Sequence, residues 1–266
     1  MKDRPPYLFA TAVRRPASAH VAVTSDVGTA VTELAVHGRW ERRMAAELST
    51  AIRKCHAEQP RAVIVNLHDL GDPLGDSMPL WLTERRVAMR LRPAVLLALS
   101  LPTTAPLHRR LRRVGAYRYL PMYASMPEAH AALADQSPRL DLMQVSLPPE
   151  LTAARTARDL VEQACVSWGL TRVLHPARLV VSELTANAVT HARTDLTVTV
   201  SRRGSGLHVS VSDGDPQLPQ LDPPESTRAE HGRGLYLVHK CAAAWGSMPT
   251  CTGKVVWATL YHRSRL

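Results

Sequence analysis

The chain has 266 residues, 45% of them apolar, so it can form one large or two ordinary globular domains, and two is the better expectation. Its formal net charge of +10 comes almost entirely from arginine and favours acidic partners, whether protein, nucleotide or nucleic acid. The longest strongly apolar run, residues 94–99, is far too short to span a bilayer, and the first residues do not lead into a signal-like apolar segment. We therefore expect a cytoplasmic protein that does not enter the membrane.

The first half of the chain alternates between strand and helix patterns. Such alternation predicts an α/β domain with a mixed, mostly parallel sheet and helices packed on it. The strand patterns lie at residues 31–37, 62–67, 94–100 and 117–120, and the helix patterns at residues 41–56, 78–90, 105–114 and 127–133.

A short polar segment at residues 134–139 separates this pattern from a new start. We place a domain boundary there, which gives domains at residues 20–138 and 139–266. Long helices and alternating strands in the second domain predict an α+β sandwich, with one sheet, helices on one face and a ligand between them. Its expected helices are residues 149–168, from near 176 through the motif below, and 235–244, and its expected strands are residues 196–200, 207–212 and 255–261.

The segment from Ser182 to His191 places a carboxylate, an amide and an imidazole at successive intervals of four residues. On a helix, this spacing sets Glu183, Asn187 and His191 on nearly one face. An amide oxygen is a hard ligand for magnesium, and a carboxylate one turn away can orient or deprotonate a nucleophile. For His191, which lies further around the helix, a structural hydrogen bond is the better interpretation.

Two further motifs follow in order. Asp213 ends an expected strand, where a buried carboxylate can accept a hydrogen bond from the exocyclic amine of adenine, whereas guanine offers a carbonyl there. Gly232 and Gly234 permit close backbone approach at a helix start, where unpaired N–H groups attract phosphate, and Arg233 adds a charged donor. Taken singly, Asp213 could be a loop cap and the Gly-Arg-Gly triplet an ordinary turn.

The three motifs in this order resemble the GHKL superfamily of ATPases and kinases, which includes heat-shock protein 90, DNA gyrase and histidine kinases. More narrowly, residues 145–262 resemble the anti-sigma-factor serine/threonine kinase branch. The resemblance implies a Bergerat-type fold that binds ATP and Mg²⁺. It also implies the following roles: Glu183 as general base, Asn187 as magnesium ligand, Asp213 as adenine reader, and Gly232, Arg233, Gly234 and Leu235 as the phosphate loop.

Two positions depart from the family pattern. Val255 stands where a threonine often supports adenine recognition, and Asp215 replaces a common glycine. The first change removes a hydrogen bond worth about 0.5–1.5 kcal/mol. Asp215 could crowd the phosphates or cap the segment that follows, residues 216–230, which we interpret either as a nucleotide lid or as a simple surface loop.

The first half, from about residue 28 to 135, resembles the anti-sigma-factor antagonist (STAS) module, in which a serine at a helix start receives phosphate. Ser77 lies near that place, but the local spacing is shifted, so helix capping by Ser77 is the better interpretation and phosphoacceptor chemistry the alternative. The arginine-rich helix at residues 105–114 could bind nucleic acid. An ordinary solvated helix face, or a surface for an acidic protein, explains it better.

Together these features predict an ATP-binding anti-sigma regulatory factor with protein serine/threonine kinase activity that controls a sigma factor by partner switching. The expected partners are a sigma factor, an anti-sigma-factor antagonist, or both, and a homodimer is one expected assembly because related kinases often form dimers. The alternative is a non-catalytic module that binds ATP, or no nucleotide, and sequesters a transcription regulator. Direct nucleic-acid binding is the weakest hypothesis.

Overall fold

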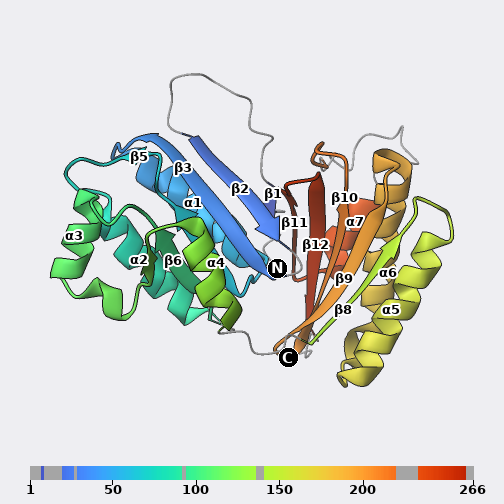
Figure 1. Ribbon diagram of the computed structural model, residues 1–266. Helices are drawn as coiled ribbons and strands as arrows, with labels where there is room; N and C mark the ends of the chain where they lie inside the picture. The colour runs from blue at the N-terminus through green and yellow to red at the C-terminus, as the bar shows by residue number, and fades with distance from the viewer. Residues whose placement is uncertain are drawn as a thin grey trace. The chain divides into compact units, whose positions relative to one another are not determined.

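The computed structural model describes residues 7–8, 20–26, 29–91, 94–135, 141–219 and 233–261 (Figure 1). The chain divides into two compact units, one formed by residues 12–138 and the other by residues 139–266 together with residues 1–11. Among the described residues, no helix has the length and apolar character needed to cross a bilayer.

Residues 12–138 are organised around a mixed sheet with the strand order β2-β3-β4-β6-β7, and β5 pairs with β3 beside this path. β2 runs antiparallel to β3, whereas all the other pairs are parallel, so the expected mixed, mostly parallel sheet is confirmed. Its strands are β2 (His20–Asp26), β3 (Val31–Arg39), β4 (Ala62–Asn66), β5 (Leu70–Gly71), β6 (Leu96–Ser100) and β7 (Met122–Tyr123).

Both faces of this sheet are buried. Ala62 and Ile64 pack in one cluster with Ala129 and Leu133 of helix α4 (Met126–Asp135). The alternate residues of β4 point to the opposite face and are also fully buried, which explains why this strand is a continuous apolar run. The other helices of the unit are α1 (Met44–Ala57), α2 (Met78–Arg90) and α3 (Pro106–Arg113).

The start of α2 is held by buried polar contacts rather than by a cap from Ser77. Asp72 accepts hydrogen bonds from the backbone N–H groups of Asp76 and Ser77, at 2.8 and 3.1 Å. The Ser77 hydroxyl donates to Asp72 Oδ2 at 2.6 Å and accepts from Trp81 Nε1 at 2.9 Å, and both Ser77 and Trp81 are fully buried. The capping interpretation of Ser77 was therefore wrong: its side chain makes no capping bond, and the N–H groups of Met78 and Leu80 bond to the backbone oxygens of Gly75 and Ser77.

The C-terminal unit has a second sheet with the strand order β1-β11-β12-β10-β9-β8, antiparallel except for the β1–β11 pair. Figure 1 shows its helices together on one face of the sheet, which confirms the α+β sandwich. The strands are β1 (Tyr7–Leu8), β8 (Leu142–Leu147), β9 (Leu196–Arg203), β10 (Gly206–Asp213), β11 (Ala244–Pro249) and β12 (Lys254–Tyr261), and the long helices are α5 (Ala153–Ser167), α6 (Leu174–Asn187) and α7 (Arg233–Cys241).

Several elements differ from the sequence expectation. Residues 116–118 form a 3₁₀ turn instead of part of a strand, because Gly115 adopts a left-handed backbone (φ 72°) and the chain pairs with β6 only at β7. The expected helix at residues 149–168 begins at α5, after the unpredicted strand β8. Likewise, α7 ends before residue 244, where strand β11 begins.

The contacts of Ser77 yield a stability prediction. Replacing Ser77 with alanine should lower the free energy of unfolding by about 1–3 kcal/mol, because the buried Trp81 N–H and the Asp72 carboxylate each lose a partner. Thr83→Ala is the matched control: its exposed hydroxyl bonds only to the Pro79 carbonyl, so a change of about 0.5 kcal/mol or less is expected. Urea unfolding measures both, and equal effects would contradict the structural role of Ser77.

Candidate nucleotide-binding site

Helix α6 holds the first motif at the edge of its buried face. Ala177, Val180, Val181 and Leu184 belong to the core of the C-terminal unit, so they fix the rotation of the helix on the sheet. Glu183 and Asn187 are only partly buried. One turn apart on one side of α6, they have the geometry expected from their spacing.

The second residue of α7 lies directly against this pair. A side chain at Gly234 would put its Cβ atom 2.6 Å from Glu183 Oε2 and 3.7 Å from Asn187 Oδ1. A larger residue at this position would have to displace the Glu183 carboxylate, so glycine lets a carboxylate, an amide and the first turn of a helix come together. First-turn N–H groups without helical partners attract anions. The group formed by Glu183, Asn187 and the first turn of α7 therefore suits a phosphate and its counter-ion.

Glu183 and Asn187, beside the start of α7, fit a magnesium ion held mainly by nucleotide phosphates. Asn187 contributes a hard oxygen ligand, and Mg²⁺ typically takes one or two protein ligands together with phosphates and water. In the part of the chain that the structure describes, no group of three or more His, Cys, Asp or Glu side chains could hold a metal by itself. Asn187 is thus the residue that would hold the ion, with Glu183 beside it.

The end of α6 changes the position of His191. Residues 188–192 form a π-helical turn that ends at Arg193, whose backbone is left-handed (φ 55°). The His191 ring is exposed, and the structure records no hydrogen bond for it among the described residues, so the expected structural hydrogen bond is not found. The wider turn explains this, because it breaks the four-residue spacing that relates His191 to Asn187.

Asp213 ends β10 as a buried carboxylate with defined partners. Its Oδ1 atom accepts hydrogen bonds from Lys254 Nζ at 2.9 Å and from the Asp215 backbone N–H at 3.0 Å. Burial raises the pKa of Asp213, and the hydrogen bonds from Lys254 and Asp215 oppose that rise. The position is therefore polar, enclosed and compensated for charge.

Lys254 is a site residue that the sequence reasoning missed. In the register of β10 and β12 it lies directly opposite Asp213, and it is 6% exposed. Its ammonium group contacts Asp213 Oδ1 and also the backbone oxygen and Oδ2 of Asp215, at 3.1 and 3.0 Å. One signal was present in the sequence, since a lysine begins an otherwise apolar strand, but the pairing of β12 with β10 could not be read from it.

Strand alternation also changes the interpretation of Val255. Val256, Ala258 and Leu260 of β12 belong to the core beneath the helices, so Val255 and Trp257 point to the opposite face. Lys254 shares the helix-facing side with Val256. A hydroxyl at position 255 would thus point away from Asp213, and the residue that faces Asp213 at this end of β12 is Lys254.

Close backbone packing fixes the turn after β10. A Cβ atom at Gly253 would lie 2.0 Å from the Asp213 carbonyl oxygen, so this position accepts only glycine. The Gly214 N–H donates to Thr194 Oγ1 at 2.8 Å.

Asp215 has a lowered pKa, chiefly because its carboxylate accepts a hydrogen bond from the Gln217 backbone, with Lys254 and His191 adding to the effect. Asp215 therefore begins the following segment as a charged, tethered residue.

Part of the expected site lies outside the described residues. This applies to Gly232 and to residues 220–230 of the expected lid. Arg233 begins α7, but its side chain is also outside the description. Leu235 is described and is buried in the core, where it anchors α7 beside Gly234. The structure thus brings together Glu183, Asn187 and Gly234, with Asp213 at the end of a core strand.

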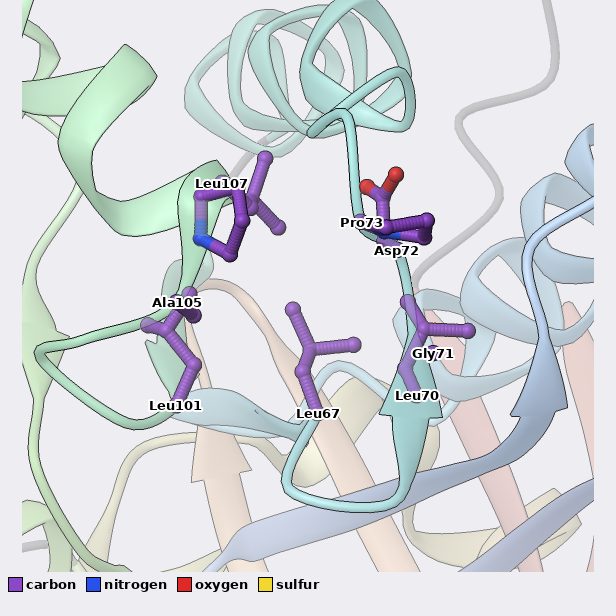
Figure 2. A pocket seen from close by; sticks show the side chains of 9 residues that line it. Leu67, Leu70, Gly71, Asp72, Pro73, Leu101, Ala105 and Leu107 are labelled. Atoms are coloured by element: carbon purple, nitrogen blue, oxygen red, sulfur yellow. The ribbon is translucent and has the colours of Figure 1, made fainter.

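Two features of the other unit are relevant to the second expected site. The Ser77 hydroxyl is buried and bonded as described above, so the structure presents no accessible hydroxyl there. Nearby, a cavity of about 210 Å³ opens beyond the ends of β4 and β6, and Figure 2 shows Leu67, Leu101 and Leu107 around it. It is mostly apolar and smaller than the roughly 300–1,000 Å³ of ordinary small-molecule sites.

Comparisons with known proteins gave two matches. The chain is similar to the crystal structure of an anti-sigma factor antagonist from Mycobacterium paratuberculosis, with 21% identity, coverage of 46% of this chain and 100% of that chain, and a TM-score of 0.38. No curated protein matches the chain. Residues 147–260 match the family model described as the histidine kinase-like ATPase domain. This segment contains the motifs on α6, β10 and α7, so the C-terminal unit of the chain carries a histidine kinase-like ATPase domain.

Proposed function

We propose that this protein is an ATP-binding anti-sigma regulatory factor with protein serine/threonine kinase activity. The observation that carries the proposal is the close approach of Gly234 to Glu183 and Asn187, which brings a carboxylate, an amide and a helix start together. Such a grouping suits phosphate transfer, because phosphoryl transfer depends mainly on positioning and charge compensation.

Each residue has a separate task in this mechanism. Glu183 would accept the proton of the attacking hydroxyl as the γ-phosphate passes to that hydroxyl and ADP leaves, and Asn187 would hold the magnesium ion that offsets the phosphate charge. The first turn of α7 supplies N–H donors, and Gly234 lets the phosphate approach the backbone. Asp213 accepts a hydrogen bond from the adenine amine and thereby places the nucleotide.

The proposed biological role is control of a sigma factor in the cytoplasm through partner switching. The ATPase domain would phosphorylate an antagonist protein or bind a sigma factor, and the N-terminal unit would serve as the interaction or regulatory part. Assembly as a homodimer is part of this proposal. Support comes from the ATPase family match and from the mixed sheet with helices in residues 12–138.

A second function is favoured by the state of Asp213. Because Lys254 already donates to this carboxylate, the protein could use nucleotide only as a structural ligand, or not use it, and sequester a transcription regulator without transferring phosphate. The two functions differ in one measurable property. A kinase turns ATP over on a protein hydroxyl, whereas a binding module forms a stable complex without turnover.

The first test is calorimetric titration of the full chain with ATP and with GTP in the presence of magnesium. We expect saturable binding of ATP and much weaker binding of GTP, with at least tenfold loss of ATP affinity in Asp213→Asn and Asn187→Ala, because each loses a direct ligand contact. Asp141→Asn, at an exposed residue paired with Arg202, is the matched control and should bind ATP normally. Failure of the unmodified chain to bind ATP would refute the nucleotide site.

The second test concerns Glu183. Glu183→Gln should lower transfer of radiolabelled γ-phosphate to proteins in a lysate of the source organism by about 10²-fold or more, with ATP binding retained, because the general base is lost. Glu162→Gln on α5, an exposed partner of Arg178, should leave transfer unchanged. Undiminished transfer in Glu183→Gln would disprove the base assignment, whereas ATP binding without any transfer would favour the binding module.

The third test concerns Gly234→Ala. The new Cβ atom would meet the end of the flexible Glu183 side chain, so the carboxylate should swing away at little cost to the fold. Alanine also favours a helix by up to about 1 kcal/mol over glycine. We expect an unchanged or higher melting temperature with phosphate transfer reduced as strongly as in Glu183→Gln. A variant with normal transfer would show that the close approach of Gly234 to Glu183 is not needed for the reaction.

A further inference from the structure

We propose that Lys254 determines the base selectivity of this site, because it occupies one oxygen of Asp213 and so leaves a single acceptor for the nucleotide base. The inference rests on the proposed ATP-binding function and adds a residue to it. Lys254 and Asp213 face each other across β12 and β10, on the side of the sheet that the helices cover.

The ammonium group of Lys254 has no donor left for a ligand. Its three N–H bonds match three acceptors: Asp213 Oδ1 at 2.9 Å, Asp215 Oδ2 at 3.0 Å and the Asp215 backbone oxygen at 3.1 Å. The side chain is 7% exposed. Lys254 is therefore a fixed internal partner of Asp213, and it shapes recognition through that carboxylate rather than by touching the base.

The two oxygens of Asp213 are not equivalent. Oδ1 accepts from Lys254 and from the Asp215 backbone N–H, which uses both of its lone-pair directions. For Oδ2, the structure records no hydrogen bond from the described residues. Asp213 can thus offer a base one oxygen, and Lys254 offsets part of its negative charge.

Adenine and guanine make different demands on a carboxylate. Adenine presents an exocyclic amine beside the acceptor nitrogen N1, so one free carboxylate oxygen is sufficient. Guanine presents two parallel donors, N1–H and the 2-amine. These donors fit a carboxylate whose two oxygens are both free, because each donor can then bond to one oxygen. With Oδ1 occupied, guanine keeps at most one of these bonds and leaves a second donor unpaired, which discriminates against it.

The test is titration of the full-length protein with ATP, GTP and inosine triphosphate, each with magnesium, before and after Lys254→Met. Freeing Oδ1 should lower the ATP-over-GTP preference about 10- to 100-fold, the equivalent of one charge-assisted hydrogen bond. Inosine triphosphate lacks the 2-amine of guanine, so it should gain clearly less affinity than GTP does.

A second variant separates occupancy of Oδ1 from the charge of Asp215. Asp215→Ala keeps the contact between Lys254 and Asp213 and alters a side chain that is 27% exposed, so the preference for ATP should persist. If Lys254→Met does not fold, as judged by circular dichroism and thermal unfolding, Asp215→Ala decides alone: a retained preference supports the inference, and a lost preference overturns it.

The remaining outcomes distinguish this inference from the proposed function. No ATP binding by the unmodified chain would remove the nucleotide site itself. ATP binding by the unmodified chain together with an unchanged ATP-over-GTP ratio in a folded Lys254→Met variant would overturn the role of Lys254 and leave the nucleotide site standing. A rise in affinity for all three nucleotides by the same factor would also overturn it, because Lys254 would then act as a general competitor.

Discussion

The candidate site depends on how α6 is seated on the sheet. Four apolar side chains of this helix, among them Val180 and Leu184, are buried against the core, and each fixes the rotation of the helix about its axis. Burying a valine or leucine side chain contributes about 1.5–3 kcal/mol. Glu183 and Asn187 therefore occupy their positions because the core holds the helix, and α7 can approach them as closely as it does only through Gly234.

The sequence predicted those features that depend on local periodicity. The four-residue spacing of Glu183 and Asn187 correctly placed them together, and the alternation of β10 correctly put Val209 and Val211 in the core. The short strands β8 and β11 were missed: β8 lies wholly before the expected helix at residues 149–168, and β11 overlaps the expected helix at residues 235–244 only at Ala244. β8 is stabilised by pairing with β9, which is distant in the chain, and β11 by pairing with β12. Neither pairing can be read from the local sequence.

The contacts that could not be predicted depend on the register in which strands pair, above all that of β10 with β12. Lys254 follows Asp213 by 41 residues, and nothing local indicates that the two are direct neighbours. The comparison with the family pattern directed attention to Val255, yet a shift of one residue along a strand reverses the face to which a side chain points. Similarly, the Ser77 hydroxyl donates to Asp72 instead of capping α2, a choice between local partners that only the backbone path settles.

The two unusual residues near Asp213 are best understood together. A buried lysine with one acidic partner would keep unsatisfied donors, and a buried aspartate without a cation would be driven to take up a proton. Asp215 supplies the remaining acceptors for Lys254, including a backbone oxygen, so the three residues form a satisfied group. A glycine at position 215 would offer only the backbone oxygen. The departure from glycine thus gives the lysine beside Asp213 its third acceptor, and the same group ties the residue before the segment 216–230 to the sheet.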